Sequence, residues 1–302
     1  MLDQRHRSGD PRADRRAEYA EHYARSGDVK AAVELIGQAL ELAPDWTLGR
    51  LRQAEYLDAA GDRQSAAAAY AAIVDADPAD VYGAGLKLAA MGYGPVPDAP
   101  PPAFVASLFD QYAERFEASL VHKLHYSVPD TLSDMLGLKD GPPLGAALDL
   151  GCGTGLMGER LRPYALRLDG IDLSDGMLAR ARSKRLYDGL YQADIVAPPD
   201  AVLQRRYDLV TAADVLIYLG DLTPAFGTAR ALLAEGGRFA FSVETDEAAP
   251  AYRLRPNLRY AHATAHVVDR LRACGFGSVR QQATILRQDA GEDVAGMLFI
   301  CD

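Results

Sequence analysis

The chain has 302 residues, a length that favours two domains. Hydrophobic residues make up 49% of the sequence, which is enough to bury a core and excludes a chain that is disordered throughout. The 32 basic and 42 acidic residues leave a net charge of −10. This balance argues against a protein that coats phosphate backbones, because such a protein needs a basic face, so we expect no nucleic-acid partner.

Cysteine content and hydropathy exclude further classes of protein. The three cysteines are too scattered for a disulfide framework or a Cys-x-x-Cys site, and we expect no metal. The sequence lacks a run of about 18 apolar residues, so we expect no membrane partner. Residues 1–13 are polar and lack the apolar segment of a secretory signal. We interpret them as a disordered lead-in and expect a cytoplasmic location.

The segment 14–91 contains an internal repeat. Gly27-Asp28 and Gly61-Asp62 are 34 residues apart, and each unit predicts a helix, a glycine turn, a second helix and a proline stop. The same offset relates Ala20 to Ala54, Ala32 to Ala66, Ala39 to Ile73 and Pro44 to Pro78. This pattern resembles the tetratricopeptide repeat. Two repeats and a closing helix at 81–91 are few for a free-standing array. We therefore expect this part to dock on the neighbouring domain or on a second copy of itself, as a homodimer, and a protein partner is a further possibility.

The segment 92–103, GYGPVPDAPPPA, is dense in proline and glycine and separates this helical part from the rest of the chain. Two interpretations remain open. The segment is either a semi-rigid linker or an ordered loop packed on the second domain.

From residue 104 onward, short apolar runs alternate with amphipathic stretches. Strands that alternate with helices predict βαβ units, so the expected fold class is α/β with a mostly parallel sheet. Helices are predicted at 104–120, 128–137, 156–165, 176–184, 223–234 and 265–275, and strands at 146–151, 166–174, 190–194, 207–215 and 237–245, with a closing hairpin at 278–287 and 295–302.

The strongest motif in the sequence is Asp149-Leu150-Gly151-Cys152-Gly153-Thr154-Gly155, which follows a predicted strand and precedes a predicted helix. Glycines there permit a tight turn and let a ligand lie against bare backbone. Asp172 ends the next strand, the position from which a carboxylate accepts ribose hydroxyls. Asp149 precedes the glycines, where it would repel a pyrophosphate and attract an ammonium. Leu156-Met157 replaces the Lys-Ser of a phosphate loop, so a nucleoside triphosphate is not expected.

These features, taken in order, resemble those of class I S-adenosylmethionine-dependent methyltransferases over residues 104–302. Ala193-Asp194-Ile195 ends the third predicted strand, and Ala212-Ala213-Asp214-Val215 ends the fourth. LLAEGGRFAFSVE, at 232–244, resembles the family's turn into the fifth strand. The resemblance implies a Rossmann-like sheet closed by an antiparallel strand, and S-adenosylmethionine as the cofactor. The whole chain resembles bacterial predicted methyltransferases with N-terminal tetratricopeptide repeats.

The resemblance also implies the cofactor contacts. Asp194 lies near the adenine and Asp214 near the methionine part, although Asp214 could instead contact the substrate. Met177 could pack on the adenine or simply in the core, and Tyr112 belongs either to a lid helix at 109–117 or to a helix packed on the sheet. Cys152 is expected to be a small buried filler and not a nucleophile. The full predicted set is Asp149, Gly151, Cys152, Gly153, Gly155, Asp172, Leu173, Met177, Ala193, Asp194, Ile195, Ala213, Asp214 and Tyr112.

Catalytic residues are predicted from position. Tyr260 and His262 follow the fifth strand, on the side of the sheet where substrate is expected. A base is needed only if the acceptor must lose a proton, and an imidazole with a pKa of about 6.5 suits that role. A structural role for both residues remains open.

The predicted function is therefore methyl transfer from S-adenosylmethionine to a small molecule or peptide. The fourth strand lacks the Asn/Asp-Pro-Pro-aromatic run typical of enzymes that methylate exocyclic or side-chain amides, which disfavours DNA amine or glutamine methylation. The alternative is an interaction protein whose repeats bind a partner and whose second domain binds the cofactor without catalysis.

Overall fold

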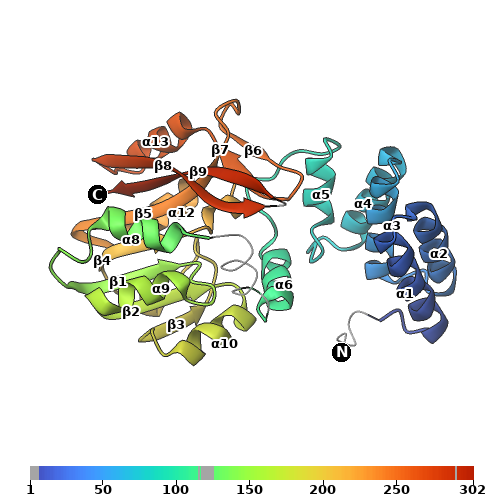
Figure 1. Cartoon of the computed structure of the whole chain (residues 1–302), viewed down its shortest axis with the longest axis horizontal. Coiled ribbons are helices and arrows are strands. Elements are labelled where there is room, and N and C mark those ends of the chain that lie inside the picture. Colours follow the sequence, from blue (N-terminus) through green and yellow to red (C-terminus); the bar gives the residue numbers. More distant parts are fainter. Residues whose placement is uncertain (1–6, 115, 117–125, 290) are drawn as a thin grey trace. The chain divides into compact units, whose positions relative to one another are not determined.

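The computed structural model describes residues 7–114, 116, 126–289 and 291–302 (Figure 1). The chain divides into two compact units, residues 1–97 and 98–302. The first is helical and the second is built around a sheet, as the change of sequence pattern predicts.

The helical unit consists of α-helices that pack in sequence order. Its helices are α1 (Pro11–Arg25), α2 (Val29–Leu42), α3 (Thr47–Ala59), α4 (Arg63–Ala76) and α5 (Ala84–Ala90). Gly27 and Gly61 both take left-handed backbone angles, with φ of 90° and 84°, and end the first helix of each pair. Asp28 and Asp62 then cap the next helix, because each side chain accepts a backbone N–H three residues on, at 3.1 Å. The two turns are thus equivalent, and the assignment to the tetratricopeptide class stays a prediction.

Small residues set the spacing of these helices. Ala13, Ala20, Ala32 and Ala39 are fully buried between α1 and α2, where larger side chains would hold the helices apart. The helix begins at Pro11, three residues before the predicted start of the domain, because Pro is favoured in the first turn and Asp10 caps it.

The end of the Pro/Gly segment is ordered against the second unit. The carbonyl of Asp98 accepts the backbone N–H groups of Gly220 at 2.7 Å and Asp221 at 3.1 Å. The Tyr252 hydroxyl donates to the Asp98 carboxylate at 2.7 Å. From Asp98 onward, these contacts favour the packed-loop interpretation over a free linker.

Among the described residues, the second unit has a nine-stranded sheet with the order β3-β2-β1-β4-β5-β7-β6, while β9 pairs with both β5 and β8. The pairs from β3 through β2, β1 and β4 to β5 are parallel, and β9 runs antiparallel to β5 and β8. The strands are β1 (Leu144–Leu150), β2 (Ala165–Asp172), β3 (Gly189–Gln192), β4 (Tyr207–Ala212), β5 (Leu233–Thr245), β6 (Tyr252–Leu254), β7 (Tyr260–His262), β8 (Val279–Asp289) and β9 (Glu292–Cys301).

Helices cover both faces of this sheet (Figure 1). The α-helices are α6 (Pro102–Tyr112), α8 (Val128–Leu136), α9 (Leu156–Leu161), α10 (Asp175–Lys184), α11 (Asp200–Leu203), α12 (Thr223–Leu232) and α13 (Thr264–Ala273). Alternation along β1 shows how the faces separate. Leu148 and Leu150 pack with α12 and α13, whereas Ala147 packs with α8 and α9. Asp149 therefore faces the α9 side.

Three departures from the predicted elements have local causes. The helix after β1 ends at Leu161, because Pro163 lies in the short turn Arg162–Tyr164 that follows. The predicted helix 104–120 is α6 over 102–112, and residues 115 and 117–120 of that prediction lie outside the described residues. The hairpin of β6 and β7 was not predicted, since strands of three residues are too short to show alternation.

Candidate cofactor site

The glycine run forms the turn between β1 and α9. Gly151, Gly153 and Gly155 all have positive φ, at 65°, 53° and 93°, a region that residues with a Cβ enter at a cost. A Cβ on Gly151 would lie 2.3 Å from Cγ2 of Val215, so this glycine is required by packing. A Cβ on Gly153 would meet nothing within 4 Å. The backbone at Gly153 thus borders open space, as a ligand cradle requires.

Asp172 closes the other side of this loop. Its carboxylate accepts the N–H of Gly153 at 2.8 Å and the N–H of Ser174 at 2.9 Å. Burial is the main cause that raises the pKa of Asp172. The strand end predicted to bind a ribose therefore touches the glycine run directly.

Asp149 is buried and is held by two hydroxyl groups of the protein. Its carboxylate is buried and accepts the Tyr187 hydroxyl at 2.7 Å and the Thr211 hydroxyl at 3.0 Å. Burial raises the pKa of Asp149 to about 7, and the two hydroxyls oppose this shift. Tyr187 was not predicted as a site residue, because its role depends on the loop between α10 and β3 folding back over the glycine turn.

The remaining predicted cofactor residues lie along the carboxyl ends of the same strands. Cys152 is buried, and burial raises the pKa of its thiol well above the ordinary value, which accords with a filler. Met177 is buried in α10, Ile195 joins the core, and Leu173 is half-buried. The Ala193 N–H donates to the Asp172 carbonyl at 3.0 Å, and Asp194 accepts the Val196 N–H at 3.0 Å, so β3 ends in an ordered turn beside Asp172.

Helix α6 docks on the start of α10. The Asp110 carboxylate accepts the Ser174 hydroxyl at 2.6 Å and the Gly176 N–H at 3.0 Å. A Cβ on Gly176 would lie 3.2–3.3 Å from Asp110 and Ala113, so the glycine permits the close approach. Asp110 was not predicted, although it lies within the predicted lid segment.

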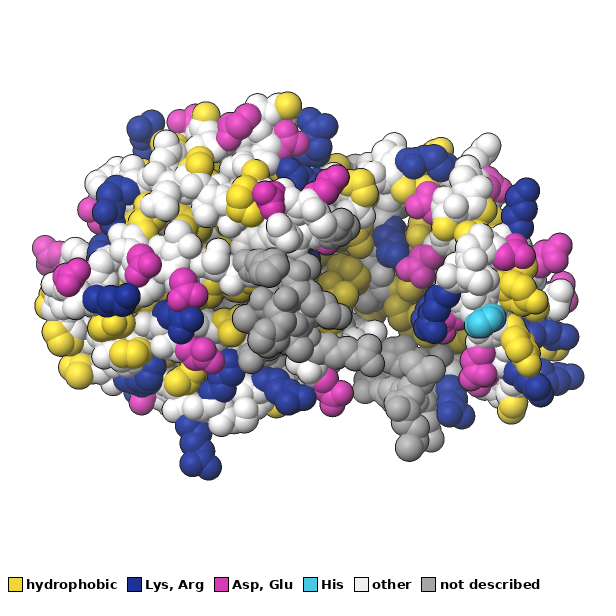
Figure 2. Space-filling model, viewed as in Figure 1, with side chains coloured by type: hydrophobic (Ala, Val, Ile, Leu, Met, Phe, Trp, Pro, Cys, Tyr) yellow, Lys and Arg dark blue, Asp and Glu magenta, His cyan; other side chains and the backbone are white. Residues whose placement is uncertain are grey.

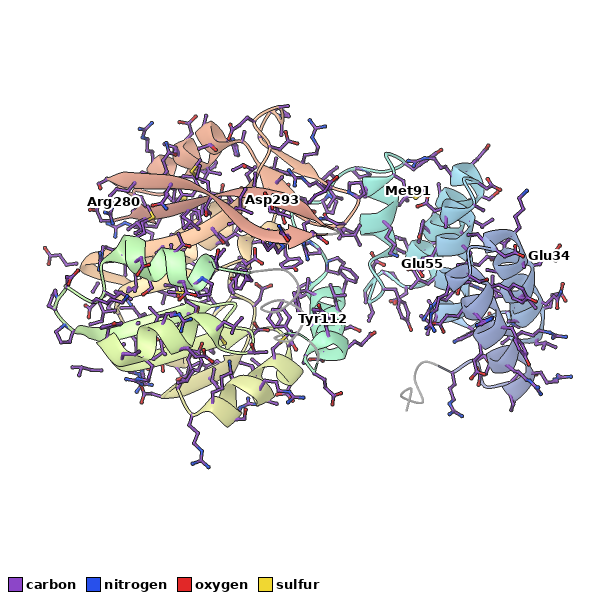
Figure 3. All side chains as sticks on the ribbon, viewed as in Figure 1. Glu34, Glu55, Met91, Tyr112, Arg280 and Asp293 are labelled. Atoms are coloured by element: carbon purple, nitrogen blue, oxygen red, sulfur yellow. The ribbon has the colours of Figure 1, made fainter. Side chains whose placement is uncertain are left out.

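An aromatic cluster continues from α6. Phe109 makes an edge-to-face contact with Tyr218, with ring centroids 5.3 Å apart, and Tyr112 contacts Phe116 at 5.7 Å. Tyr112 lies in the last turn of α6, beside the sheet (Figure 3). The contact between Phe109 and Tyr218 ties the helix to the turn after β4, which is the arrangement a lid needs.

The turn after β4 carries a buried ionic cluster. Asp214 accepts Nη1 of Arg287 at 2.6 Å, and Nη2 of the same guanidinium is bonded to Glu244. Nη1 of Arg255 reaches the second oxygen of Glu244 at 3.1 Å. Neither Arg287 nor Glu244 was predicted as a site residue. Arg287 lies 73 residues from Asp214 in the sequence, and no spacing rule connects them.

The two predicted catalytic residues lie in β7 and are fully buried. Nε2 of His262 lies 3.2 Å from the Gly220 carbonyl, and burial lowers the pKa of His262 to about 4. Tyr260 packs edge-to-face on Tyr252. Burial of this kind is typical of residues that stabilise the β6–β7 hairpin. The catalytic assignment stays a prediction, and the structure gives it no support.

The donor set fits S-adenosylmethionine. The hydroxyl of Thr154, in the glycine run, is buried and has no hydrogen-bond partner among the described residues, as expected of a group that awaits a ligand. Together with the open space at Gly153 and the carboxylate of Asp172, it offers donors and acceptors at one end of the sheet. Within the described ranges, no three His, Cys, Asp or Glu side chains gather as metal ligands.

Comparison with known proteins agrees with this geometry. Residues 148–239 match the family model of a methyltransferase domain, a span that runs from β1 into β5. Nodulation protein S of Rhizobium tropici is 32% identical over 116 residues, which cover 37% of this chain and 48% of that protein. Methyltransferase-like protein 27 of Homo sapiens is 28% identical over 178 residues, 56% of this chain and 66% of that protein. The chain thus spans about half to two thirds of the length of these curated relatives.

The fold itself is shared with a solved enzyme structure. A SAM-dependent methyltransferase of Leishmania major superposes with a TM-score of 0.54 at 15% identity, covering 67% of this chain and 82% of that one. The second unit therefore has the Rossmann-like fold of S-adenosylmethionine-dependent methyltransferases, with a mostly parallel sheet and an antiparallel strand pair. The predicted fold class of this unit is confirmed, and so is S-adenosylmethionine as the cofactor of this fold.

Proposed function

We propose that the chain is an S-adenosylmethionine-dependent methyltransferase that acts on a small molecule or peptide. The observation that carries the proposal is the 2.8 Å contact between Asp172 and the N–H of Gly153, which joins the acidic strand end to an open glycine turn. The methyltransferase-domain match, which includes both residues, supports it.

In this proposal each group has a distinct task. Asp172 accepts the ribose hydroxyls, the backbone at Gly153 supports the nucleoside, and Asp149 contributes negative charge beneath the cationic part of the ligand. When bound, the cofactor supplies an electrophilic methyl group. Helix α6, held by Asp110, excludes water, and exclusion of water strengthens each electrostatic contact in the site. The chain therefore acts mainly by alignment and desolvation.

The acceptor is proposed to be a small molecule or peptide, for two reasons. The turn Ala212-Ala213-Asp214-Val215 lacks the proline-aromatic run of amide methylation. Basic and acidic side chains are interspersed on the face shown in Figure 2, where a phosphate backbone would require a basic track.

No helix in the described part of the chain has the length and apolar character to cross a membrane.

Calorimetric titration with S-adenosylhomocysteine tests the proposal. Wild-type protein should bind in the micromolar range, and Asp172→Ala should weaken binding by about 100-fold, because about two charge-assisted hydrogen bonds are lost. Asp188→Ala is the matched control, since Asp188 also accepts a backbone N–H between strands, that of Leu168 at 2.8 Å, but precedes β3. Failure of the wild type to bind, or equal binding by Asp172→Ala, would refute the cofactor site.

A second candidate function has one observation in its favour. The helical unit contains a hollow of about 440 Å³ lined by Pro44, Trp46 and Tyr82, among others. Aromatic side chains around a hollow suit an extended peptide or a second chain. If the protein binds S-adenosylhomocysteine but transfers no labelled methyl group to any fraction of a metabolite or peptide extract, this interaction function becomes the better account.

A further inference from the structure

The proposed function gives no role to the buried ionic cluster of Arg287, Asp214 and Glu244 at the turn after β4. We propose that Arg287 is a positioning residue, which holds this turn against the glycine run so that the run keeps its ligand-binding shape. The inference rests on the proposed function, and it adds a residue from the C-terminal hairpin to the cofactor site.

The Arg287 side chain is fully buried, and β8, from which it projects, is bonded only to β9 among the described strands. The guanidinium therefore reaches past β9 to contact Glu244 on β5 and Asp214 after β4. Burying a charge is unfavourable unless it is well paired, so both carboxylates are held in place by the need to compensate it.

The backbone of Asp214 has a φ of 56°, a left-handed angle that is uncommon for residues other than glycine. Two contacts maintain this angle. One is the 2.6 Å bond from Arg287 to the carboxylate, and the other is the 2.8 Å bond that the Asp214 N–H donates to the Ser242 hydroxyl. A strained angle persists only when its surroundings fix it from more than one side.

Val215 connects this turn to the glycine run. Val215, the next residue, fills the space where Gly151 has no Cβ; a Cβ there would lie 2.3 Å from Cγ2 and 2.7 Å from Cβ of Val215. A change at Asp214 therefore moves Val215, and Val215 is in direct contact with the first glycine of the turn. The chain of contacts runs from Arg287 through Asp214 and Val215 to Gly151.

Arg287→Met tests this chain, because methionine fills similar volume without the charge. We expect the Kd of the full-length protein for S-adenosylhomocysteine to rise about tenfold, and amide hydrogen exchange in a peptide covering 148–158 to quicken without ligand. Arg287→Lys, which keeps the charge but makes one contact, should give an intermediate Kd. Arg253→Met is the control for loss of a paired arginine. Arg253 lies in β6, is exposed, and pairs with Asp246 at 2.9 Å.

A double-mutant cycle separates positioning from direct contact. Asp214→Asn removes the partner charge and tolerates the left-handed angle. If Arg287 acts through Asp214, the double variant should bind hardly worse than Arg287→Met alone. Additive losses would mean that the two residues act separately, and would overturn the inference.

Other outcomes are equally decisive. If Arg287→Met unfolds at a lower urea concentration but keeps the wild-type Kd and wild-type exchange at 148–158, its role is structural only and the inference is wrong. If Arg287→Met does not fold, an unchanged Kd and unchanged exchange in Asp214→Asn overturn it. If the wild type itself binds no S-adenosylhomocysteine, the proposed function fails. The exchange comparison, which needs no ligand, then still reports whether Arg287 holds the glycine run.

Discussion

The substitution Gly153→Ala should weaken ligand binding much more than it lowers the stability of the fold. In Gly153→Ala the new Cβ meets no protein atom within 4 Å, so the substitution adds only the strain of a left-handed alanine, about 1–2 kcal/mol. The methyl group projects into the space where the nucleoside is proposed to lie. We therefore expect the free energy of unfolding to fall by about 1–2 kcal/mol while the Kd for S-adenosylhomocysteine rises at least about 30-fold.

Two other glycines provide the controls. Gly137 ends α8 with a φ of 65° and also has nothing within 4 Å of its missing Cβ, so Gly137→Ala should lose similar stability and keep the wild-type Kd. In Gly151→Ala the Cβ would collide with Val215, so overpacking of about 1–3 kcal/mol adds to the strain, and stability should fall furthest.

Urea unfolding measures the stability of the three variants, and calorimetric titration measures their Kd for S-adenosylhomocysteine. Gly153→Ala and Gly137→Ala should differ in their Kd for S-adenosylhomocysteine and not in their stability. If the two variants bind S-adenosylhomocysteine equally well, the open space at Gly153 is not the ligand site.

Three further outcomes follow from the same contacts. Burial holds the pKa of Asp149 near 7, above 3.8 in the unfolded chain, so stability should fall by up to about 4 kcal/mol as pH rises from 4 to 7, and Asp149→Asn should flatten that fall in urea titrations. The pKa of His262 near 4 lies below 6.5, so acidification from pH 6.5 to 4 should remove up to about 3 kcal/mol. His262→Gln should abolish that part of the slope, and an unchanged slope would contradict the burial argument. Asp110→Ala should quicken hydrogen exchange in α6 and weaken ligand binding several-fold, because the bonds to Ser174 and Gly176 are lost; unaltered exchange would show that α6 docks by other contacts.

Much of the second unit could be read from the sequence, because its elements are set by local patterns. Apolar runs of strand length, separated by amphipathic helices, imply parallel strands whose carboxyl ends meet at one edge. Residues that end consecutive strands, such as Asp149 and Asp172, therefore had to lie near the glycine run. The glycines themselves followed from the tight turn between strand and helix, and all three have positive φ.

Only the tertiary structure decided which way the side chains point and which residues they contact. Alternation along β1 turns Asp149 to the α9 side, and the fold of a distant loop brings Tyr187 to it. His262 follows the fifth strand as predicted, yet pairing of β7 with β5 and β6 buries its ring. Such outcomes depend on contacts between segments far apart in the chain, which residue spacing does not encode.

The cluster of Arg287, Asp214 and Glu244 shows this limit most clearly. Neither Arg287 nor Glu244 stands out in its own segment of the sequence, and only the antiparallel closure of β9 on β5 brings β8 within reach of the turn after β4. By itself, the sequence determined the order of the elements, the glycine run and the acidic strand ends, because these arise from interactions between near neighbours. The shape in which the glycine run is held was decided by packing across the sheet, because a buried charge is stable only where the folded chain supplies its partners.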